Sequence, residues 1–260
     1  MADVRPLILI PSYNTGPILE RTVTAVLALK VPVWVIIDGS TDGSADSITR
    51  LENSENSDFR IIRLPVNSGK GAAIHHGLRE AVTGGFTHVL TMDADGQHPA
   101  DKVKRFFELS AAYPEAAVFG RPVFDASAPA LRVQGRKISN FWANLETLGW
   151  GIDDSLFGMR LYPAQALLEV QESTCFARRF DFDPEVAVRL AWRGVPIINL
   201  PTPVRYPSKE EGGVSQFRYI RDNTLLTCMH IRLLLGFLIR LPLLLARREN
   251  PLDHLTPPAP

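Results

Sequence analysis

The chain has 260 residues, of which 45% are hydrophobic and 22% charged, a composition that excludes a protein disordered along most of its length. Its 28 Lys and Arg residues balance 28 Asp and Glu residues, so no net positive field favours nucleic acid as a partner. The two cysteines, Cys175 and Cys228, lack CxxC spacing, which argues against a disulfide framework and a zinc site. The segment Met1-Ala2-Asp3 begins no signal peptide, so we expect a cytoplasmic protein.

From Val4 to about Val123, short apolar runs alternate with segments of helical period. The apolar runs predict strands at residues 7–10, 33–37, 59–62 and 88–92. The intervening and following segments predict helices at residues 19–27, 44–51, 72–82 and 99–112. This order predicts an α/β fold with a doubly wound, mostly parallel sheet flanked by helices. In such a fold the ligand lies beyond the carboxyl ends of the strands, where this chain has loops rich in glycine and polar residues.

The second half of the chain predicts helices at 132–150 and 184–192 and a strand at 197–200. A long loop rich in proline and glycine follows this strand, and loops of that length are uncommon unless they are functional. We expect three parts, a main domain, a helical segment and a disordered tail, at residues 1–217, 218–248 and 249–260.

The C-terminal helical segment has a strongly apolar core at residues 231–245, which Arg232, Arg240 and Pro242 interrupt. No clean run of about 18–20 apolar residues is therefore expected for a membrane-spanning helix. The basic residues fall in one sector, opposite a leucine-rich face: Arg221, Arg232, Arg240 and Arg247. This pattern predicts an amphipathic anchor in the membrane plane, and so peripheral attachment to the cytoplasmic membrane face. The alternative is a helix packed on the main domain or on a second copy of the chain.

Paired carboxylates follow the fourth predicted strand. Asp93 and Asp95 lie two residues apart at the end of an extended run, so their side chains project to one side. Two such carboxylates repel unless a cation neutralises them, and with Gln97 nearby the oxygen ligands favour Mg²⁺ or Mn²⁺ over zinc. Such a metal takes further ligands from substrate phosphates. The alternative is a turn in which Asp and Gly supply only backbone geometry.

Two other classes of motif have a sequence similar to Asp93–Gln97. An EF-hand calcium loop needs a glutamate at its twelfth position, which is Lys104 here, so that interpretation fails. A metal-dependent phosphatase of the haloacid dehalogenase type also has an aspartate pair after a strand. Its motif usually opens the domain, whereas three βα units precede Asp93 here, so it remains a weaker alternative.

The loops carry four motifs in chain order: Pro11-Ser12-Tyr13-Asn14, Asp38-Gly39-Ser40-Thr41-Asp42-Gly43, Asn67-Ser68-Gly69-Lys70-Gly71 and Asp93-Ala94-Asp95-Gly96-Gln97-His98-Pro99. Together they resemble the family-2 glycosyltransferases of the GT-A fold, within the subgroup that includes dolichyl-phosphate mannosyl synthase. The resemblance covers residues 5–215 and extends to the segments Asp154–Arg160 and Phe182–Glu185. Because the chain has no Walker A sequence and no G-x-G-x-x-G, the other phosphate-binding motifs lack support.

The resemblance implies a role for each loop. The donor nucleotide is expected to contact Pro11, Tyr13, Asn14, Asp38, Gly39, Asn67, Lys70 and Asp93. Asp95 is expected to be the direct metal ligand, supported by Asp93 and Gln97. For Asp38 the alternative is capping of the turn that follows it, and for Lys70 it is a solvated surface position. His98 is expected to be a structural or surface residue.

The implied reaction is transfer of a sugar, with inversion, from a GDP- or UDP-linked donor to a membrane lipid acceptor. Polyprenyl phosphate is one candidate acceptor. Catalysis is expected to involve Asp93, Asp95 and the acceptor-side Asp183, for which helix capping before Pro184 is an equal alternative. A non-catalytic protein of the same fold, binding nucleotide or scaffolding a membrane, is the alternative function, and a homo-oligomer is left open.

The chain departs from the family pattern at two positions. Phe157 stands where relatives have a cysteine, which predicts a change in packing. Lys209 stands near the position of an arginine in the R-x-x-G-x-S segment that grips phosphates, and a lysine offers a point charge without the bidentate fork. This second departure leaves membrane lipids other than polyprenyl phosphate open as acceptors.

Overall fold

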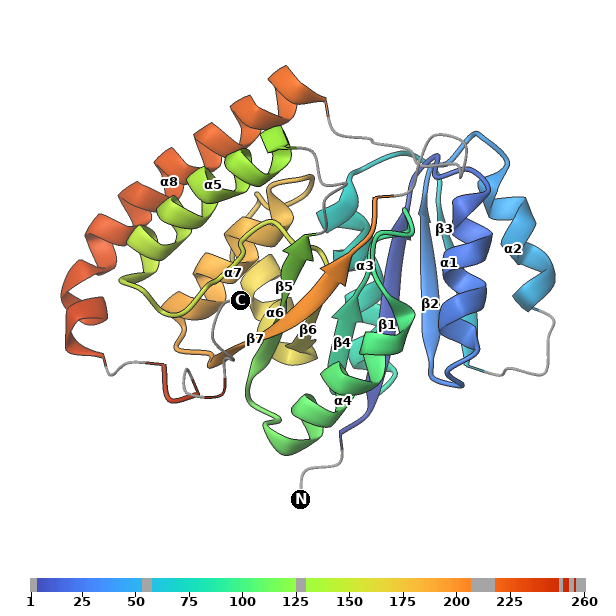
Figure 1. The fold of residues 1–260 in the computed structure, drawn as a ribbon, viewed down its shortest axis with the longest axis horizontal. Coiled ribbons are helices and arrows are strands. Elements are labelled where there is room, and N and C mark those ends of the chain that lie inside the picture. The colour runs from blue at the N-terminus through green and yellow to red at the C-terminus, as the bar shows by residue number, and fades with distance from the viewer. Residues whose placement is uncertain are drawn as a thin grey trace.

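A computed structural model describes residues 4–52, 58–124, 130–206, 218–247, 250–252 and 255. One seven-stranded sheet forms its centre, in the order β3-β2-β1-β4-β6-β5-β7 (Figure 1). The strands are β1 (Pro6–Ser12), β2 (Val33–Asp38), β3 (Phe59–Leu64), β4 (His88–Thr91), β5 (Ala117–Phe124), β6 (Arg160–Pro163) and β7 (Ile197–Val204). The helices are α1 (Ile18–Leu27), α2 (Ser44–Glu52), α3 (Lys70–Thr83), η1 (Ala100–Lys102), α4 (Val103–Ala112), α5 (Ala130–Thr147), α6 (Ala164–Glu172), α7 (Phe182–Trp192) and α8 (Tyr219–Ala246).

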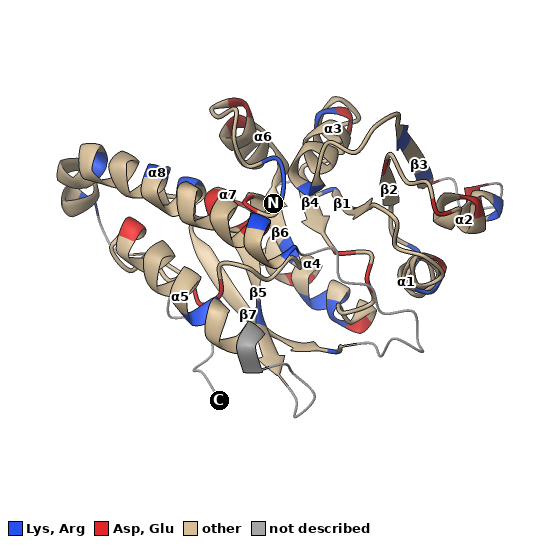
Figure 2. Cartoon of the chain, turned by 90° about the horizontal axis from the view of Figure 1, so that it is seen from above, with Lys and Arg blue, Asp and Glu red and all other residues tan. Residues whose placement is uncertain are grey.

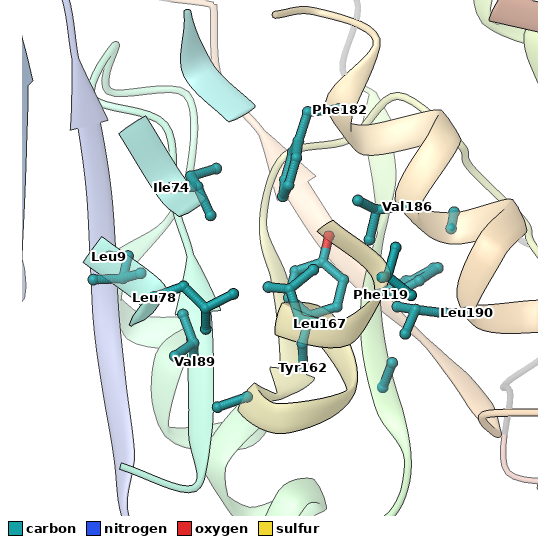
Figure 3. Packing of buried hydrophobic residues seen from close by; sticks show 14 of the residues in the cluster. Leu9, Ile74, Leu78, Val89, Phe119, Tyr162, Leu167, Phe182, Val186 and Leu190 are labelled. Atoms are coloured by element: carbon teal, nitrogen blue, oxygen red, sulfur yellow. The ribbon is translucent and has the colours of Figure 1, made fainter. Parts of the chain in front are cut away.

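The first four strands are parallel, which confirms the predicted α/β fold and doubly wound sheet. Their side chains alternate between two cores. Leu7 and Leu9 pack under α3, α6 and α7, whereas Ile8 and Ile10 pack under α1 and α4. Figure 3 shows part of the first core, where Leu9, Ile74 and Leu78 lie on one side and Phe119 and Val186 on the other. Burial on both faces explains why these strands are almost continuously apolar.

Sequence analysis did not identify β5, β6 or α6. The strand β6 is antiparallel to both β4 and β5, so the sheet is mixed in its second half. Thr91 at the end of β4 pairs with Arg160 at the start of β6. The antiparallel direction therefore brings the segment before β6, residues 154–159, to the edge of the sheet where β1 to β4 end.

The helix α8 lies beside α5 and α7 (Figures 1 and 2). By length and composition alone it is long and apolar enough to cross a membrane, although Arg232, Arg240 and Pro242 interrupt its apolar run. Arg232 and Arg240, together with Arg247 directly after the helix, turn toward the protein. The guanidinium carbons of Arg232, Arg240 and Arg247 lie 3.6, 4.6 and 4.0 Å from the ring centroids of Phe176, Trp192 and Trp150. These three members of the predicted basic sector therefore form a packing face, as in the alternative interpretation, whereas Arg221 is exposed.

The opposite side of α8 is apolar and exposed. Six large side chains project from it: Ile231, Leu235, Leu238, Ile239, Leu243 and Leu245. The neighbouring helix α5 adds Ile138, Phe141 and Leu145, which are also exposed. Exposed apolar surface on two adjacent helices is larger than scattered single residues would give, and such patches mark interaction sites.

The described part of the predicted C-terminal tail is packed against the protein. Asn250 is buried, and its side-chain Nδ2 donates to the carbonyl oxygen of Ile197 at 2.8 Å. Leu252 and Leu255 pack against the core that includes β7. These residues are packed on the protein, and the rest of the predicted tail lies outside the described residues.

Candidate active site

A cavity of about 1160 Å³ lies at the carboxyl edge of the sheet. The sequence-predicted residues that line it are Pro11, Tyr13, Asp38, Asn67, Lys70, Asp93, Asp95, Gln97 and Asp183. These residues come from four loops and from α7, and the fold brings them together because parallel strands end at one edge. Lys209 lies outside the described residues. The cavity continues between α5 and α8, where apolar side chains replace the polar ones: Ile138, Trp142, Leu226, Ile231 and Leu234.

The centre of the site is an ion triplet. The ammonium Nζ of Lys70, at the start of α3, lies 2.8 Å from Oδ1 of Asp93 and 2.6 Å from Oδ2 of Asp183. The Lys70 and Asp183 side chains are only 15% and 7% exposed. Lys70 is thus a buried link between β4 and α7, and its alternative as a solvated surface lysine is wrong.

The pKa values of Lys70, Asp93 and Asp183 depend on burial and on the charges of the other two groups. Burial would lower the pKa of Lys70, but the carboxylates of Asp183 and Asp93 outweigh burial and raise it above its ordinary value. Burial also acts to raise the pKa of Asp93, yet the Lys70 ammonium lowers it below the ordinary range. For the more deeply enclosed Asp183, burial dominates and its pKa is raised. Lys70 therefore stays charged, and Asp183 is the more basic of the two carboxylates.

Asp183 is positioned from several sides. The helix α7 begins after Asp181, whose carboxylate accepts the backbone N–H groups of Ala177 and Arg179 in the preceding loop at 3.1 and 2.9 Å. Asp183 lies inside the first turn of α7, and its carboxylate pairs with Lys70. The capping alternative for Asp183 is therefore wrong. The guanidinium of Arg160, fully buried at the start of β6, donates to the carbonyl oxygens of Asp183 and Asp154 at 2.5 and 2.8 Å. Asp183 Oδ1 is buried and has no hydrogen-bond partner among the described residues.

His98 is a structural residue, as expected. Its Nδ1 accepts the backbone N–H of Asp93 at 3.0 Å, and its ring packs edge-on against Phe157 with centroids 4.7 Å apart. Phe157 thus acts in packing, as predicted for this departure from the family pattern. Burial lowers the pKa of His98 to about 4, so the ring is neutral near pH 7 and can accept this N–H.

Asp38 supports the third loop. Its two carboxylate oxygens accept the backbone N–H groups of Ser68 and Gly69 at 2.9 and 2.7 Å. Gly39 lies against the same loop, because a Cβ there would be 2.5 Å from the backbone nitrogen of Asn67. Its φ of +67° also favours glycine. Asp38 still lines the cavity, so loop support and contact with a nucleotide base are compatible roles.

Asn14 fixes the second loop rather than lining the cavity. Its side-chain Oδ1 accepts the backbone N–H of Thr41 at 2.8 Å, and its own backbone N–H donates to Ser40 Oγ at 3.0 Å. Of the three residues predicted to form a nucleoside wall in the first loop, Pro11 and Tyr13 line the cavity.

The oxygen atoms around Asp95 fit a metal ion that takes some of its ligands from the substrate. Asp95 Oδ1 accepts the backbone N–H of Gln97 at 3.1 Å, and the two side chains line the cavity with Asp93. Among the described residues, no group of three or more His, Cys, Asp or Glu is placed to hold a metal ion by itself. One or two carboxylates with an amide oxygen match Mg²⁺ or Mn²⁺ sites that are completed by phosphates.

Sequence analysis missed several cavity residues on α5 and α8. Arg136 lines the cavity, and its Nη1 donates to Asp154 Oδ1 at 2.7 Å. Ser139 and His230 also line it, with their Oγ and Nε2 atoms 3.1 Å apart, and His230 Nδ1 lies 3.0 Å from Oε1 of the buried Glu146. These residues lie outside the strand-end loops. The one sequence signal for them was the helical period of α5, which indicates that one face of this helix is buried.

The fold and site define a GT-A-type protein, in which acidic and lysine-bearing loops meet at the carboxyl edge of the sheet. The sequence model of the glycosyl transferase family 2 matches residues 7–170. The chain therefore belongs to glycosyl transferase family 2, and it is a nucleotide-sugar-dependent glycosyltransferase.

Individual relatives agree with this assignment. Over 220 residues the chain is 26% identical to the polyprenol monophosphomannose synthase of Mycolicibacterium smegmatis, which covers 81% of this chain and 82% of that protein. A 90-residue stretch is 36% identical to the poly-β-1,6-N-acetyl-D-glucosamine synthase of Staphylococcus aureus and covers 34% of this chain and 21% of that protein.

The fold is similar to glucosyl-3-phosphoglycerate synthase from Mycobacterium tuberculosis, which was solved with Mn²⁺, UDP and glucosyl-3-phosphoglycerate. The TM-score is 0.65 at 18% identity, with 91% of this chain and 80% of that chain covered. At this identity the likeness supports the fold.

The lowered pKa of His98 predicts a stability that depends on pH. The unfolded chain binds the histidine proton near pH 6.5, whereas the folded protein binds it only near pH 4. Acidification from pH 6.5 to 4 therefore favours the unfolded state, by up to about 3 kcal/mol. The His98→Asn variant, whose Oδ1 still accepts the Asp93 N–H, should lose less stability over this range. Urea unfolding at a series of pH values, in EDTA, measures the difference, and parallel pH profiles would contradict it.

Proposed function

We propose that this protein transfers a sugar, with inversion, from a GDP- or UDP-linked donor to a lipid acceptor. One observation carries the proposal: a single cavity joins the polar strand-end loops to an apolar region between α5 and α8. The polar end suits a nucleotide diphosphate sugar, and the apolar end suits a lipid chain. Membership of the glycosyl transferase family removes the phosphatase alternative.

The donor is expected at the polar end. Pro11 and Tyr13 offer a wall for the nucleoside, with the Tyr13 ring available for stacking, and Asp38 offers a carboxylate for base N–H groups. Asn67 and Lys70 lie where α3 begins, so amide and ammonium groups are available for ribose or phosphate oxygens. GDP and UDP donors remain equal candidates.

Asp95, Asp93 and Gln97 are the residues proposed to hold Mg²⁺ or Mn²⁺. When bound, such a cation supplies positive charge that offsets the negative charge of a departing diphosphate. The related fold of glucosyl-3-phosphoglycerate synthase was solved with Mn²⁺, which supports this choice. The Lys70 ammonium, held between Asp93 and Asp183, adds positive charge at the same end of the cavity.

Asp183 is proposed to lie on the acceptor side. Its Oδ1 is buried without a partner among the described residues, and burial raises its pKa. A carboxylate with a vacant acceptor oxygen and a raised pKa suits removal of a proton from a hydroxyl acceptor. An ionised phosphate acceptor needs no base, and then Asp183 acts by holding Lys70 in place.

The acceptor is proposed to be a lipid phosphate, with polyprenyl phosphate as the first candidate. The relative from Mycolicibacterium smegmatis is named as a polyprenol monophosphomannose synthase. In this chain Arg136 contributes a cation to the wall of the cavity that Ile138 and Leu234 also line. A cation next to apolar surface matches an anionic head followed by a hydrocarbon chain.

The exposed apolar faces of α5 and α8 are proposed to rest on the cytoplasmic face of a membrane. The cavity lies between these two helices, so a lipid entering it passes from this apolar surface directly to the site. The helix α8 is also apolar enough for a bilayer by composition, while its arginines remain engaged with the protein.

The Asp95→Asn variant should lower kcat at least about 100-fold while the protein stays folded, because a carboxamide is a weak metal ligand. The assay offers GDP- and UDP-linked sugars with a lipid extract and follows product formation. Thermal shift with GDP or UDP and Mn²⁺ should show stabilisation of the wild type that the variant lacks. The exposed Asp101→Asn is the control. A wild type that binds nucleotide and Mn²⁺ but transfers no sugar would favour the non-catalytic alternative.

The Leu234→Asn variant tests the apolar end of the cavity. A polar amide in this wall should raise the KM for a short-chain polyprenyl phosphate about tenfold, because it disfavours burial of the lipid chain. The KM for the donor should not change. Leu238→Asn, on the exposed side of the same helix, is the control in vesicle-free assays. An equal acceptor KM in the two variants would place the lipid elsewhere.

Replacement of Leu238, Ile239 and Leu243 by Glu together should abolish membrane binding, since the changes place charges on the apolar face of α8. The wild type should float with anionic phospholipid vesicles, and the triple variant should stay in the dense fraction. Val66→Glu, an exposed site away from α8, is the control. Flotation of the triple variant contradicts membrane docking. If the wild type does not float but forms a dimer, and the triple variant is a monomer, the apolar face binds a second copy of the chain.

A further inference from the structure

The helix α8 reaches buried carboxylates on two other helices. Arg232 forms an ion pair with Glu185 of α7, and His230 contacts Glu146 of α5 at 3.0 Å. Both carboxylates belong to fully buried residues. Loss of the cation beside a buried carboxylate such as Glu185 strongly destabilises a folded protein, so the Arg232 ion pair favours this position of α8.

Glu185 is held between two helices. Its Oε1 accepts the Nε of Arg189, one turn further along α7, at 2.9 Å, while its Oε2 pairs with Arg232 of α8. The Arg232 guanidinium also lies over the Phe176 ring at 3.6 Å, which orients it toward Glu185. Arg189 comes from the same helix as Glu185, so Arg232 is the cation that ties Glu185 to a different element.

Glu185 shares the first turn of α7 with Asp183. The backbone N–H of Glu185 donates to the carbonyl oxygen of Asp181 at 3.1 Å, which closes this turn. On one side of this turn, Lys70 and Arg160 contact the carboxylate and carbonyl of Asp183. On the other side, Arg232 contacts Glu185. The turn is therefore clamped between the ion triplet of the active site and α8.

We propose that Arg232 is a positioning residue, which fixes the first turn of α7 through Glu185 and so keeps the Asp183 carboxylate on Lys70. This inference rests on the proposed function at one point, because it assumes that Asp183 takes part in sugar transfer. It makes α8 part of the catalytic architecture as well as a wall of the acceptor cavity. Displacement of α8 would disturb Asp183, which lies two residues before Glu185, and would leave the donor-binding loops in place.

The Arg232→Met variant of the full-length chain tests this role. Methionine keeps apolar contact with Phe176 and removes the charge. Backbone amide exchange should become faster in residues 182–186, and kcat should fall about tenfold with a donor KM that stays within about twofold of wild type. Arg232→Lys, which keeps a positive charge, should recover part of both effects.

Arg240→Met is the matched control, because Arg240 also stacks on a ring, that of Trp192, and lies two turns along the same helix. It should leave amide exchange in residues 182–186 and kcat unchanged. Equal behaviour of the two methionine variants would overturn the proposal. If Arg232→Met does not fold, Arg232→Gln, which also removes the charge, carries the test, and wild-type exchange and kcat in that variant would overturn the proposal.

The exchange measurement separates this inference from the proposed function. A wild type that transfers no sugar from any donor refutes the proposed function, while faster exchange in Arg232→Met alone still supports clamping of the α7 turn. A wild type that transfers sugar, together with unchanged exchange and kcat in Arg232→Met, refutes the clamp and leaves the proposed function intact.

Discussion

The contact of one ammonium group with two carboxylates holds the site together. Lys70 comes from the start of α3, Asp93 from the end of β4 and Asp183 from the first turn of α7, so the triplet joins three elements that are distant in sequence. At such short distances and with little solvent, two carboxylates without a cation between them could not both stay ionised. The Lys70 ammonium offsets part of the charge of the two carboxylates, which makes burial of the triplet tolerable, and its two ion pairs fix where the strand-end loops meet α7.

Close backbone packing lets the triplet form. Gly158 lies directly against it, because a Cβ at this position would collide with the Asp93 carboxylate and the Lys70 ammonium. The carbonyl oxygen of Gly158 accepts the hydroxyl of Thr91 at 3.0 Å, which ties the segment before β6 to the end of β4. The antiparallel direction of β6 therefore matters for the site, because it places Gly158 and the buried Arg160 at the edge of the sheet where the cavity lies.

The sequence predicted the parallel half of the fold and the strand-end loops well, because apolar runs and polar loop motifs are local signals. It did not predict that Lys70 pairs with Asp183, since 113 residues separate them and no periodicity reports such a contact. The strand β6 has only four residues, too short for a reliable pattern. For α8, helical period correctly placed the arginines in one sector, but it could not say whether that sector faces water or protein.

That ambiguity has a physical origin in arginine itself. A guanidinium is weakly hydrated, planar and able to stack on aromatic rings, so a row of arginines can form a packing face where lysines would favour water. On α8 three arginines lie over Phe176, Trp192 and Trp150, which come from different parts of the chain. The leucines are left outside as a consequence. A helix of this kind presents apolar surface to its surroundings while its charges bind it to the rest of the protein, so the exposed apolar face and the contacts with buried carboxylates are opposite sides of one element.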